Sequence, residues 1–371
     1  MTPRGGPEMA GMRNRKIVIK LGTGVLTHGI GELDTARMGA ICAQVADALK
    51  GGWKPILVSS GAVGLGMGRL GLKSRPKKTS SVQMCAAVGQ GILIQTWGEL
   101  FAPFGVCVAQ ILLTRDDLDV RARHKAMRDL LDELLGEGIV PIINENDCIS
   151  AVELNIKFGD NDVLSSLVAA LSKSSKLLIL STAPGLVDIG GTGEVIPEVL
   201  KIDAGIRAKA GGTSSATAVG GMATKIKAAE IATSSGCEVF IASGARDGVI
   251  ADILAGKNPG TRFAASGSGA NSKKRWLAYF GRTIGKIFVD AGAADAIRNK
   301  GSSLLPAGVR AVSGKFSKGS LVEILDADSG DIVARGLAEE NSEDIKESLS
   351  AARKKCGHKD VVVHRDNLAV V

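Results

Sequence analysis

Lys16-Ile-Val-Ile-Lys-Leu-Gly-Thr-Gly24 is a short apolar run that leads into a glycine-rich turn. Apolarity that is continuous rather than alternating is typical of a strand whose two faces are both covered by helices. Segments with helical spacing of apolar residues follow such runs, so the pattern predicts an α/β fold, an αβα sandwich around a mostly parallel central sheet. The further strand-like runs lie at 55–59, 106–113, 139–143, 177–180 and 238–242, and the helical segments at 37–50, 82–101, 121–135, 162–172 and 221–235.

A second, smaller domain is expected in the C-terminal part of the chain. The alternating pattern stops near residue 263, and the stretch Ala264-Ala-Ser-Gly-Ser-Gly-Ala-Asn-Ser272 has the composition of a linker. Short strand-like runs with frequent turn residues come after it, which is typical of a mainly β module. The predicted parts are a disordered N-terminus at 1–14, a main domain at 15–263, a linker at 264–280 and the small domain at 281–371.

Composition narrows the kinds of partner. The net charge of +8 favours nucleotides, acidic metabolites or nucleic acid. Aromatic residues make up only 3% of the chain, which argues against a surface that stacks bases on aromatic rings. The sequence has no apolar run long enough to span a membrane, and its six cysteines form no Cys-x-x-Cys pair. Because residues 1–15 lack an apolar stretch, no secretory signal is expected. We therefore expect a cytoplasmic protein with buried free thiols and no membrane contact.

A glycine pattern at Gly66-Met-Gly-Arg-Leu-Gly71 matches the dinucleotide-binding signature GxGxxG. That signature needs a strand directly before the first glycine and an acidic residue about twenty positions further on. Neither requirement is met, so no dinucleotide site is expected. The four histidines have no metal-ligand spacing, and we expect no zinc site.

Two glycine-rich turns beside lysines indicate a phosphate site. Lys20 comes just before the turn at 22–24, where successive backbone N–H groups can hold an anion. Gly220 and Gly221 open a predicted helix, and Lys225 lies in its first turns, where a cation is unfavourable unless an anion lies nearby. A plain turn with a surface lysine would explain the first of these segments equally well.

Polar clusters follow two other strands. Ser59-Ser60-Gly61-Ala62 offers hydroxyl and backbone donors to a carboxylate, although a simple turn also has this composition. Asn144-Glu-Asn-Asp147 and Gly159-Asp-Asn-Asp162 place eight residues, most of them polar, within nineteen positions, and helix capping accounts for only one of them. Because ligands bind at the carboxyl ends of parallel strands, the four segments together predict phosphoryl transfer, with Mg²⁺ held mainly by phosphate oxygens.

The same segments resemble the amino acid kinase family, and within it the branch that phosphorylates glutamate. The resemblance rests on residues 18–23, 58–62, 86–90, 112–115, 141–147, 159–162 and 220–225. Residues 301–308 and 363–366 resemble a PUA domain. This similarity implies a kinase that converts ATP and L-glutamate to ADP and L-glutamyl 5-phosphate, the first step of proline biosynthesis from glutamate.

The resemblance also implies roles for individual residues. Lys20 and Lys225 would neutralise the transferred phosphoryl group, and Asp162 would hold both lysines. Glutamate would bind to Ser60, Gly61, Ala62, Asn146, Asp147, Asp160 and Asn161. ATP would contact Lys20, Gly22, Thr23, Ser181, Thr182, Val219, Gly220, Gly221, Met222, Ala223, Thr224 and Lys225. No protein side chains are expected to form a metal site of their own.

Two departures from the family concern the nucleotide site. Relatives often carry Thr-Asp where this chain has Ser181-Thr182, and Thr or Gly where it has Ala218-Val219. The resemblance further implies feedback inhibition by L-proline and a homo-oligomer, either dimer or tetramer. Two alternatives stay open at this point: a kinase of the same fold for aspartate, carbamate or a nucleoside monophosphate, and RNA binding through the PUA-like domain.

Overall fold

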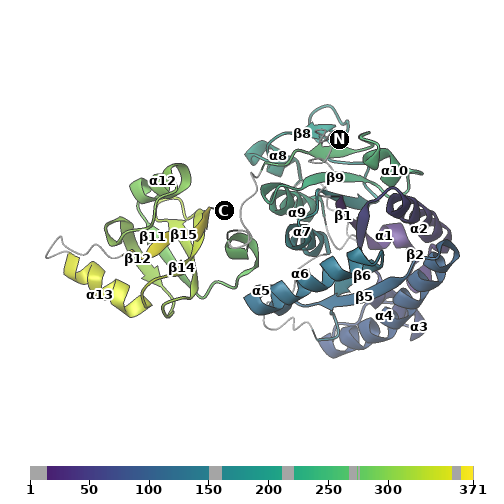
Figure 1. Cartoon of the computed structure of the whole chain (residues 1–371), viewed down its shortest axis with the longest axis horizontal. Helices are drawn as coiled ribbons and strands as arrows, with labels where there is room; N and C mark the ends of the chain where they lie inside the picture. Colours follow the sequence, from purple (N-terminus) through teal and green to yellow (C-terminus); the bar gives the residue numbers. More distant parts are fainter. Residues whose placement is uncertain are drawn as a thin grey trace, which may run out of the picture. The chain divides into compact units, whose positions relative to one another are not determined.

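A computed structural model describes residues 15–149, 161–210, 221–266, 274, 276–352 and 361–370. The chain divides into two compact units, the first made of Met1–Asp117 and Ala122–Gly269 and the second of Leu118–Arg121 and Ala270–Val371 (Figure 1). The N-terminal segment at 1–14, predicted to be disordered, lies outside the described residues. The bounds predicted for the two domains and the linker stay predictions, and each unit is described by itself below.

The first unit contains an eight-stranded sheet with the order β5-β6-β4-β1-β7-β9-β10-β8. Neighbouring strands are parallel except β9 and β10, which pair in antiparallel fashion. The mostly parallel sheet predicted from the apolar runs is therefore confirmed. The strands are β1 (Lys16–Leu21), β4 (Lys54–Val58), β5 (Val108–Leu113), β6 (Val140–Glu145), β7 (Lys176–Ser181), β8 (Glu198–Val199), β9 (Glu238–Ser243) and β10 (Thr261–Phe263).

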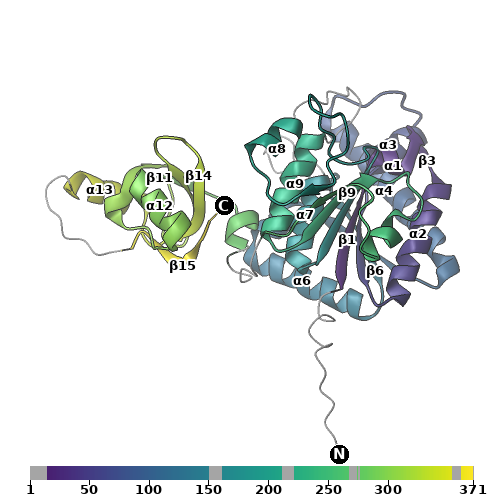
Figure 2. The ribbon, with the colours of Figure 1, turned by 90° about the horizontal axis from the view of Figure 1, so that it is seen from above.

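Helices cover both faces of this sheet, as Figure 2 shows for α7 on one side of β1 and α2 on the other. Side chains alternate along β1, so Ile17, Ile19 and Leu21 pack toward α2 while Lys20 lies on the face of α7. The helices are α1 (Thr23–Leu26), α2 (Thr35–Lys50), α3 (Ala62–Arg69), α4 (Thr79–Phe101), α5 (Arg115–Asp119), α6 (Arg121–Gly136), α7 (Asn161–Ser172), α8 (Ala204–Lys209), α9 (Met222–Ser234) and α10 (Val249–Leu254).

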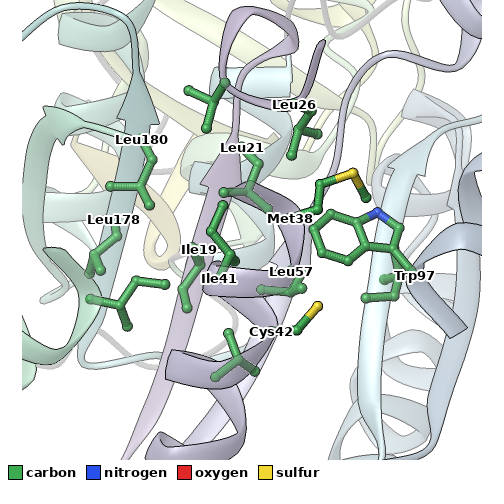
Figure 3. Packing of buried hydrophobic residues seen from close by; sticks show 14 of the residues in the cluster. Ile19, Leu21, Leu26, Met38, Ile41, Cys42, Leu57, Trp97, Leu178 and Leu180 are labelled. Carbon is green, nitrogen blue, oxygen red and sulfur yellow. The ribbon is translucent and has the colours of Figure 1, made fainter. Parts of the chain in front are cut away.

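The main core lies between the sheet and the helices α2, α4 and α10. Figure 3 shows Ile19 and Leu21 of β1 beside Met38 and Ile41 of α2, with Trp97 of α4 closing the cluster. All of these side chains are almost completely buried. Because β1 is a central strand, this packing fixes its carboxyl end, where the glycine-rich turn begins.

Short elements were not anticipated from the sequence. The hairpin of β2 (Thr27–Gly29) and β3 (Glu32–Leu33) and the helices α1, α3, α8 and α10 have no counterpart among the predicted segments. Each spans only two to eight residues, which is too short to show a clear periodicity. The longer strands and helices lie close to their predicted positions.

Glycines allow the backbones of α3 and α4 to touch. A Cβ atom on Gly66 would lie 1.8 Å from the carbonyl oxygen of Cys85, and one on Gly89 would lie 1.8 Å from that of Ala62. Gly68 approaches Gly31 of the β2–β3 hairpin in the same way. Gly66 and Gly68, the first two glycines of the GxGxxG match, therefore serve the close packing of backbones.

The second unit has a five-stranded sheet with the order β12-β11-β13-β14-β15, antiparallel except for the parallel pair β11 and β13. The mainly β module predicted for this part of the chain is confirmed. A π-helical turn at Trp276–Phe280, inside the predicted linker, buries Leu277 against Leu321. The elements are β11 (Gly285–Val289), α12 (Ala291–Lys300), β12 (Val309–Ser313), β13 (Leu321–Asp326), β14 (Ile332–Ala338), α13 (Ser342–Ala352) and β15 (Val363–Val370).

The described part of the chain contains no helix that is both long and apolar enough to cross a membrane. Its five cysteines are free, as predicted, and Cys42, Cys85 and Cys237 are buried. Cys107 is exposed and Cys148 is half-buried, so the prediction of burial is wrong for these two. Burial raises the pKa of the Cys42 thiol to about 12, so this group stays protonated at neutral pH.

We expect Gly89→Ala to destabilise the first unit by about 3 kcal/mol, because the new methyl group would overlap the Ala62 carbonyl and push α3 away from α4. Urea unfolding measures this loss. Gly91→Ala, in the same helix but with open space at its Cβ position, is the control and should be neutral or slightly stabilising. Equal stabilities for the two variants would contradict the close contact.

Candidate active site

The carboxyl ends of β1, β4, β6 and β7 lie at one edge of the parallel sheet, and the predicted site residues follow these ends. Lys20 lies near the end of β1, and Ser60 follows β4. Asn161 and Asp162 begin α7, which packs against β1. Lys225 lies in the first turns of α9, the neighbour of α7 (Figure 1). Residues more than 200 positions apart in the sequence therefore meet at one edge of the sheet.

Asp162 forms ion pairs with both predicted lysines. Its Oδ1 lies 2.5 Å from Lys20 Nζ, and its Oδ2 lies 3.0 Å from Lys225 Nζ. The side chain of Asp162 is fully buried, and those of Lys20 and Lys225 are 5% and 8% exposed. A lysine near the start of a helix needs an anion nearby, and for Lys225 this anion is Asp162. The family resemblance predicted this pairing, whereas the sequence pattern alone did not.

The charge state of Asp162 depends on these partners. Burial raises the pKa of its carboxyl group, but the two ammonium groups of Lys20 and Lys225 outweigh burial and hold the pKa below its usual value. Asp162 is thus ionised at neutral pH. The three side chains together carry two positive charges and one negative charge, an arrangement that favours a further anion at the edge of the cluster.

The start of α9 provides backbone donors beside this cluster. Gly221 is the N-cap in an extended conformation, and as a glycine it has no side chain to cap the helix. At the first two helical positions, the N–H groups of Met222 and Ala223 point out of the helix N-terminus. The Thr224 hydroxyl contacts Asp162 Oδ2 at 3.2 Å and the Gly221 carbonyl at 2.8 Å. Such a helix start binds phosphate oxygens.

The turn after β1 is only partly available to an anion. The Gly22 N–H donates to the Leu180 carbonyl of β7 at 3.1 Å, so this group continues the sheet instead of forming the predicted anion nest. A phosphate at this turn would contact the N–H groups of Thr23 and Gly24. Lys20 Nζ would lie 3.6 Å from a Cβ atom on Gly22, which places the turn beside the ion-pair cluster.

A group of amides and hydroxyls lies next to the ion-pair cluster. Asn161 Nδ2 donates to Ser60 Oγ at 2.9 Å, to the Ser59 carbonyl at 2.9 Å and to Asn144 Oδ1 at 3.0 Å. Gly61, the N-cap of α3, has φ of 105°, a conformation that favours glycine and directs Ala62 into the helix. Because Asn161 directly precedes Asp162, α7 joins the polar group to the charged one.

The remaining predicted residues fall into two groups. Asn146 and Asp147 follow β6 at the same edge of the sheet, both half-buried, and the Asn146 N–H donates to the Leu113 carbonyl. Asp160, Val219 and Gly220 lie outside the described residues. The roles that the sequence assigns to these five residues stay predictions.

Ser181 and Thr182 line a cavity of about 160 Å³ together with Gly24. The structure thus joins the ends of β1 and β7, to which the family resemblance assigns nucleotide contacts. His28, Asp34 and Arg37 also line this cavity and were not predicted. Asp34 is the N-cap of α2, and the Arg37 backbone N–H, aided by its guanidinium, holds the pKa of Asp34 below the usual value.

An Asp before the first helical residue is a recognisable capping signal, so Asp34 could have been found from the sequence. The proximity of His28 to this cavity depends on the short β2–β3 hairpin, which has no recognisable sequence pattern.

Over the residues that the structure describes, no three His, Cys, Asp or Glu side chains cluster in a way that could hold a metal ion. The carboxylate of Asp162 is already paired with two lysines.

The fold agrees with comparisons to known proteins. A model of the amino acid kinase family matches residues 15–243, and a model of the PUA domain matches residues 285–356. The chain therefore belongs to the amino acid kinase family. The PUA match corresponds to the second unit, whose resemblance to a PUA domain is confirmed.

Similar proteins carry a more specific name. The glutamate 5-kinase of Moorella thermoacetica is 44% identical over 369 residues, which cover 96% of each chain. That of Photobacterium profundum is 42% identical over 381 residues and covers both chains completely. Carbamate kinase from Giardia lamblia bound to AMP-PNP aligns with a TM-score of 0.50 and 20% identity, over 69% of this chain and all of that one, which agrees in fold.

We expect Asp162→Asn to lower the free energy of unfolding by about 3 kcal/mol at pH 7, because it leaves two buried ammonium groups without their shared carboxylate. The pKa of Asp162 is lowered in the folded state, so its contribution is complete above the unfolded pKa of about 4. It is lost as the pH falls through the lower folded value. Denaturant unfolding from pH 7 downward measures the difference between wild type and variant.

Asp132→Asn is the matched control for this experiment. Asp132 pairs with Lys16, but its side chain is 49% exposed, so its replacement should cost less than about 1 kcal/mol. A stability difference between wild type and Asp162→Asn that stays constant from pH 7 to below pH 3 would contradict the role of the ionised carboxylate.

Proposed function

We propose that this chain transfers the γ-phosphoryl group of ATP to the γ-carboxylate of L-glutamate, giving ADP and L-glutamyl 5-phosphate. The observation that carries this proposal is the junction at the start of α7. Asn161 there belongs to a group of uncharged donors and acceptors suited to an amino acid, and Asp162 holds two lysines suited to phosphate. The similarity to relatives named glutamate 5-kinase supports glutamate as the substrate.

The reaction needs little covalent assistance from the protein. A glutamate γ-carboxylate is ionised at neutral pH, so it attacks the γ-phosphorus without a general base. A bond forms between a carboxylate oxygen and phosphorus while the bond from phosphorus to the bridging oxygen of ADP breaks. Lys20 and Lys225 would neutralise the charge on the transferred group, and Asp162 would keep both ammonium groups in place.

The nucleotide would extend from these lysines over the start of α9 and the ends of β1 and β7. The N–H groups of Met222 and Ala223 would hold phosphate oxygens, and Ser181 and Thr182 would contact the rest of the nucleotide. A divalent metal, in our proposal Mg²⁺, would be held mainly by the phosphates, since Asp162 is committed to the lysines. Bound there, the metal would add neutralising charge to the phosphates.

Partners beyond the substrates follow only from the family resemblance. We keep L-proline as a feedback inhibitor, a homo-oligomer and a cytoplasmic location as parts of the proposal. RNA binding through the PUA-like domain, the alternative left open above, has no specific support, and we do not propose it.

Incubation with ATP, Mg²⁺ and a panel of amino acids, with hydroxylamine to trap acyl phosphates, tests the proposed reaction. L-Glutamate should give ADP and a hydroxamate in equal amounts, whereas aspartate should give neither. Carbamate or a nucleoside monophosphate as the preferred acceptor, with no product from glutamate, would show that the chain is a kinase of this fold with another substrate.

Lys225→Met should lower kcat by about a hundredfold or more, because one of the two ammonium groups that neutralise the transferred charge is lost. The fold should persist, since Lys20 and Asp162 remain as a pair of equal and opposite charges. Steady-state kinetics and thermal unfolding measure the two effects. Lys227→Met, exposed on the same helix, should keep full activity; a collapse of the Lys225→Met fold would make Lys225 structural.

A further inference from the structure

A buried chain of amide hydrogen bonds joins helix α4 to the candidate glutamate site. Gln90 Oε1 accepts from Asn144 Nδ2 at 3.0 Å, and Asn144 Oδ1 accepts from Asn161 Nδ2 at 3.0 Å. Gln90 is 8% exposed and Asn144 is 2% exposed. The proposed mechanism gives Gln90 no role, although it is one of very few polar side chains buried in α4.

Backbone groups fix the orientation of two amides in this chain. The Glu145 N–H donates to Asn144 at 2.9 Å, so the atom of Asn144 at that position must be the oxygen. Asn161 faces the Ser59 carbonyl at 2.9 Å, so the atom of Asn161 there must be the nitrogen. Asn144 Nδ2 then points into the interior and needs an acceptor, which Gln90 provides.

The orientation of Asn161 decides what the site offers to a ligand. With its nitrogen turned toward Ser59, Ser60 and Asn144, the Oδ1 atom of Asn161 faces the other way. This oxygen is buried and has no hydrogen-bond partner among the groups that the structure describes. A buried acceptor without a partner is unfavourable, and a ligand that brings an N–H donor removes that cost.

Helix α4 supports the neighbouring strand end as well. Trp97, two turns after Gln90, donates from Nε1 to Ser59 Oγ at 3.1 Å. Ser59 comes directly after β4, and Asn144 lies in β6, so the same helix holds the ends of two adjacent strands. Asn161 contacts both of these residues. The position of its amide therefore depends on α4 through two separate hydrogen bonds.

We propose that Gln90 is a positioning residue for substrate recognition. It holds Asn144, and through Asn144 it holds Asn161, so that Asn161 Oδ1 accepts a hydrogen bond from the α-ammonium group of the amino acid substrate. This inference rests on the proposed function. The buried amide chain would then favour binding of amino acids, which carry an ammonium group, over dicarboxylates that lack one.

Gln90→Leu removes the acceptor of Asn144 Nδ2 and tests the proposal. The KM for L-glutamate should rise about tenfold, with the KM for ATP unchanged, because only the amino acid depends on Asn161 Oδ1. Glutarate, which has both carboxylates but no ammonium group, serves as a competitive inhibitor. Its inhibition constant should change much less than the KM for glutamate, so the preference for glutamate over glutarate falls.

Gln95→Leu is the matched control, because Gln95 is exposed on the same helix and bonds only to Glu99 one turn further on. It should leave all three constants unchanged. If Gln90→Leu does not fold, Gln90→Met, which is unbranched and also lacks the acceptor, replaces it. Thermal unfolding of each variant identifies a loss of fold.

The outcomes separate this inference from the proposed function. A wild-type chain that forms no hydroxamate with glutamate overturns the proposed function. A wild-type chain that is active, together with a Gln90→Leu variant of unchanged glutamate KM, overturns the positioning role alone. Equal weakening of glutamate and glutarate also overturns it, since a general loosening of the site would affect both ligands.

Discussion

The site depends on one buried carboxylate shared by two ammonium groups. Without Asp162, Lys20 and Lys225 would repel each other in a region with little water, which would destabilise both positions. With Asp162, strand β1 and helices α7 and α9 are held together at the sheet edge by charge as well as by apolar packing. The geometry needed for phosphoryl transfer is thus also a condition for the stability of this part of the fold.

Much of the fold could be predicted because its signals are local. Each long strand is a continuous apolar run, and each long helix has a clear spacing of apolar residues, so both are visible in a short window of sequence. Lys20 and Lys225 were found for the same reason, since a lysine at a strand end or a helix start is conspicuous there. The pairing of both lysines with Asp162 came from the family resemblance and not from such a window.

Contacts that depend on how elements pack could not be predicted. The link from Gln90 to Asn144 exists because one face of α4 meets the end of β6, fifty-four positions later in the chain. His28 reaches the cavity near Ser181 through a hairpin of two very short strands. The Gly22 N–H, expected as an anion donor, pairs with Leu180 because β1 and β7 continue one residue further than the apolar run suggests.

The charge of the Lys20, Asp162 and Lys225 cluster also has a practical consequence for work in solution. Two ammonium groups and one carboxylate carry a net positive charge, which attracts small doubly charged anions. Sulfate or inorganic phosphate in a buffer would therefore compete with the nucleotide. In phosphate buffer the apparent affinity for ATP would therefore be weaker than the true affinity. A buffer with a bulky, singly charged anion would avoid this competition.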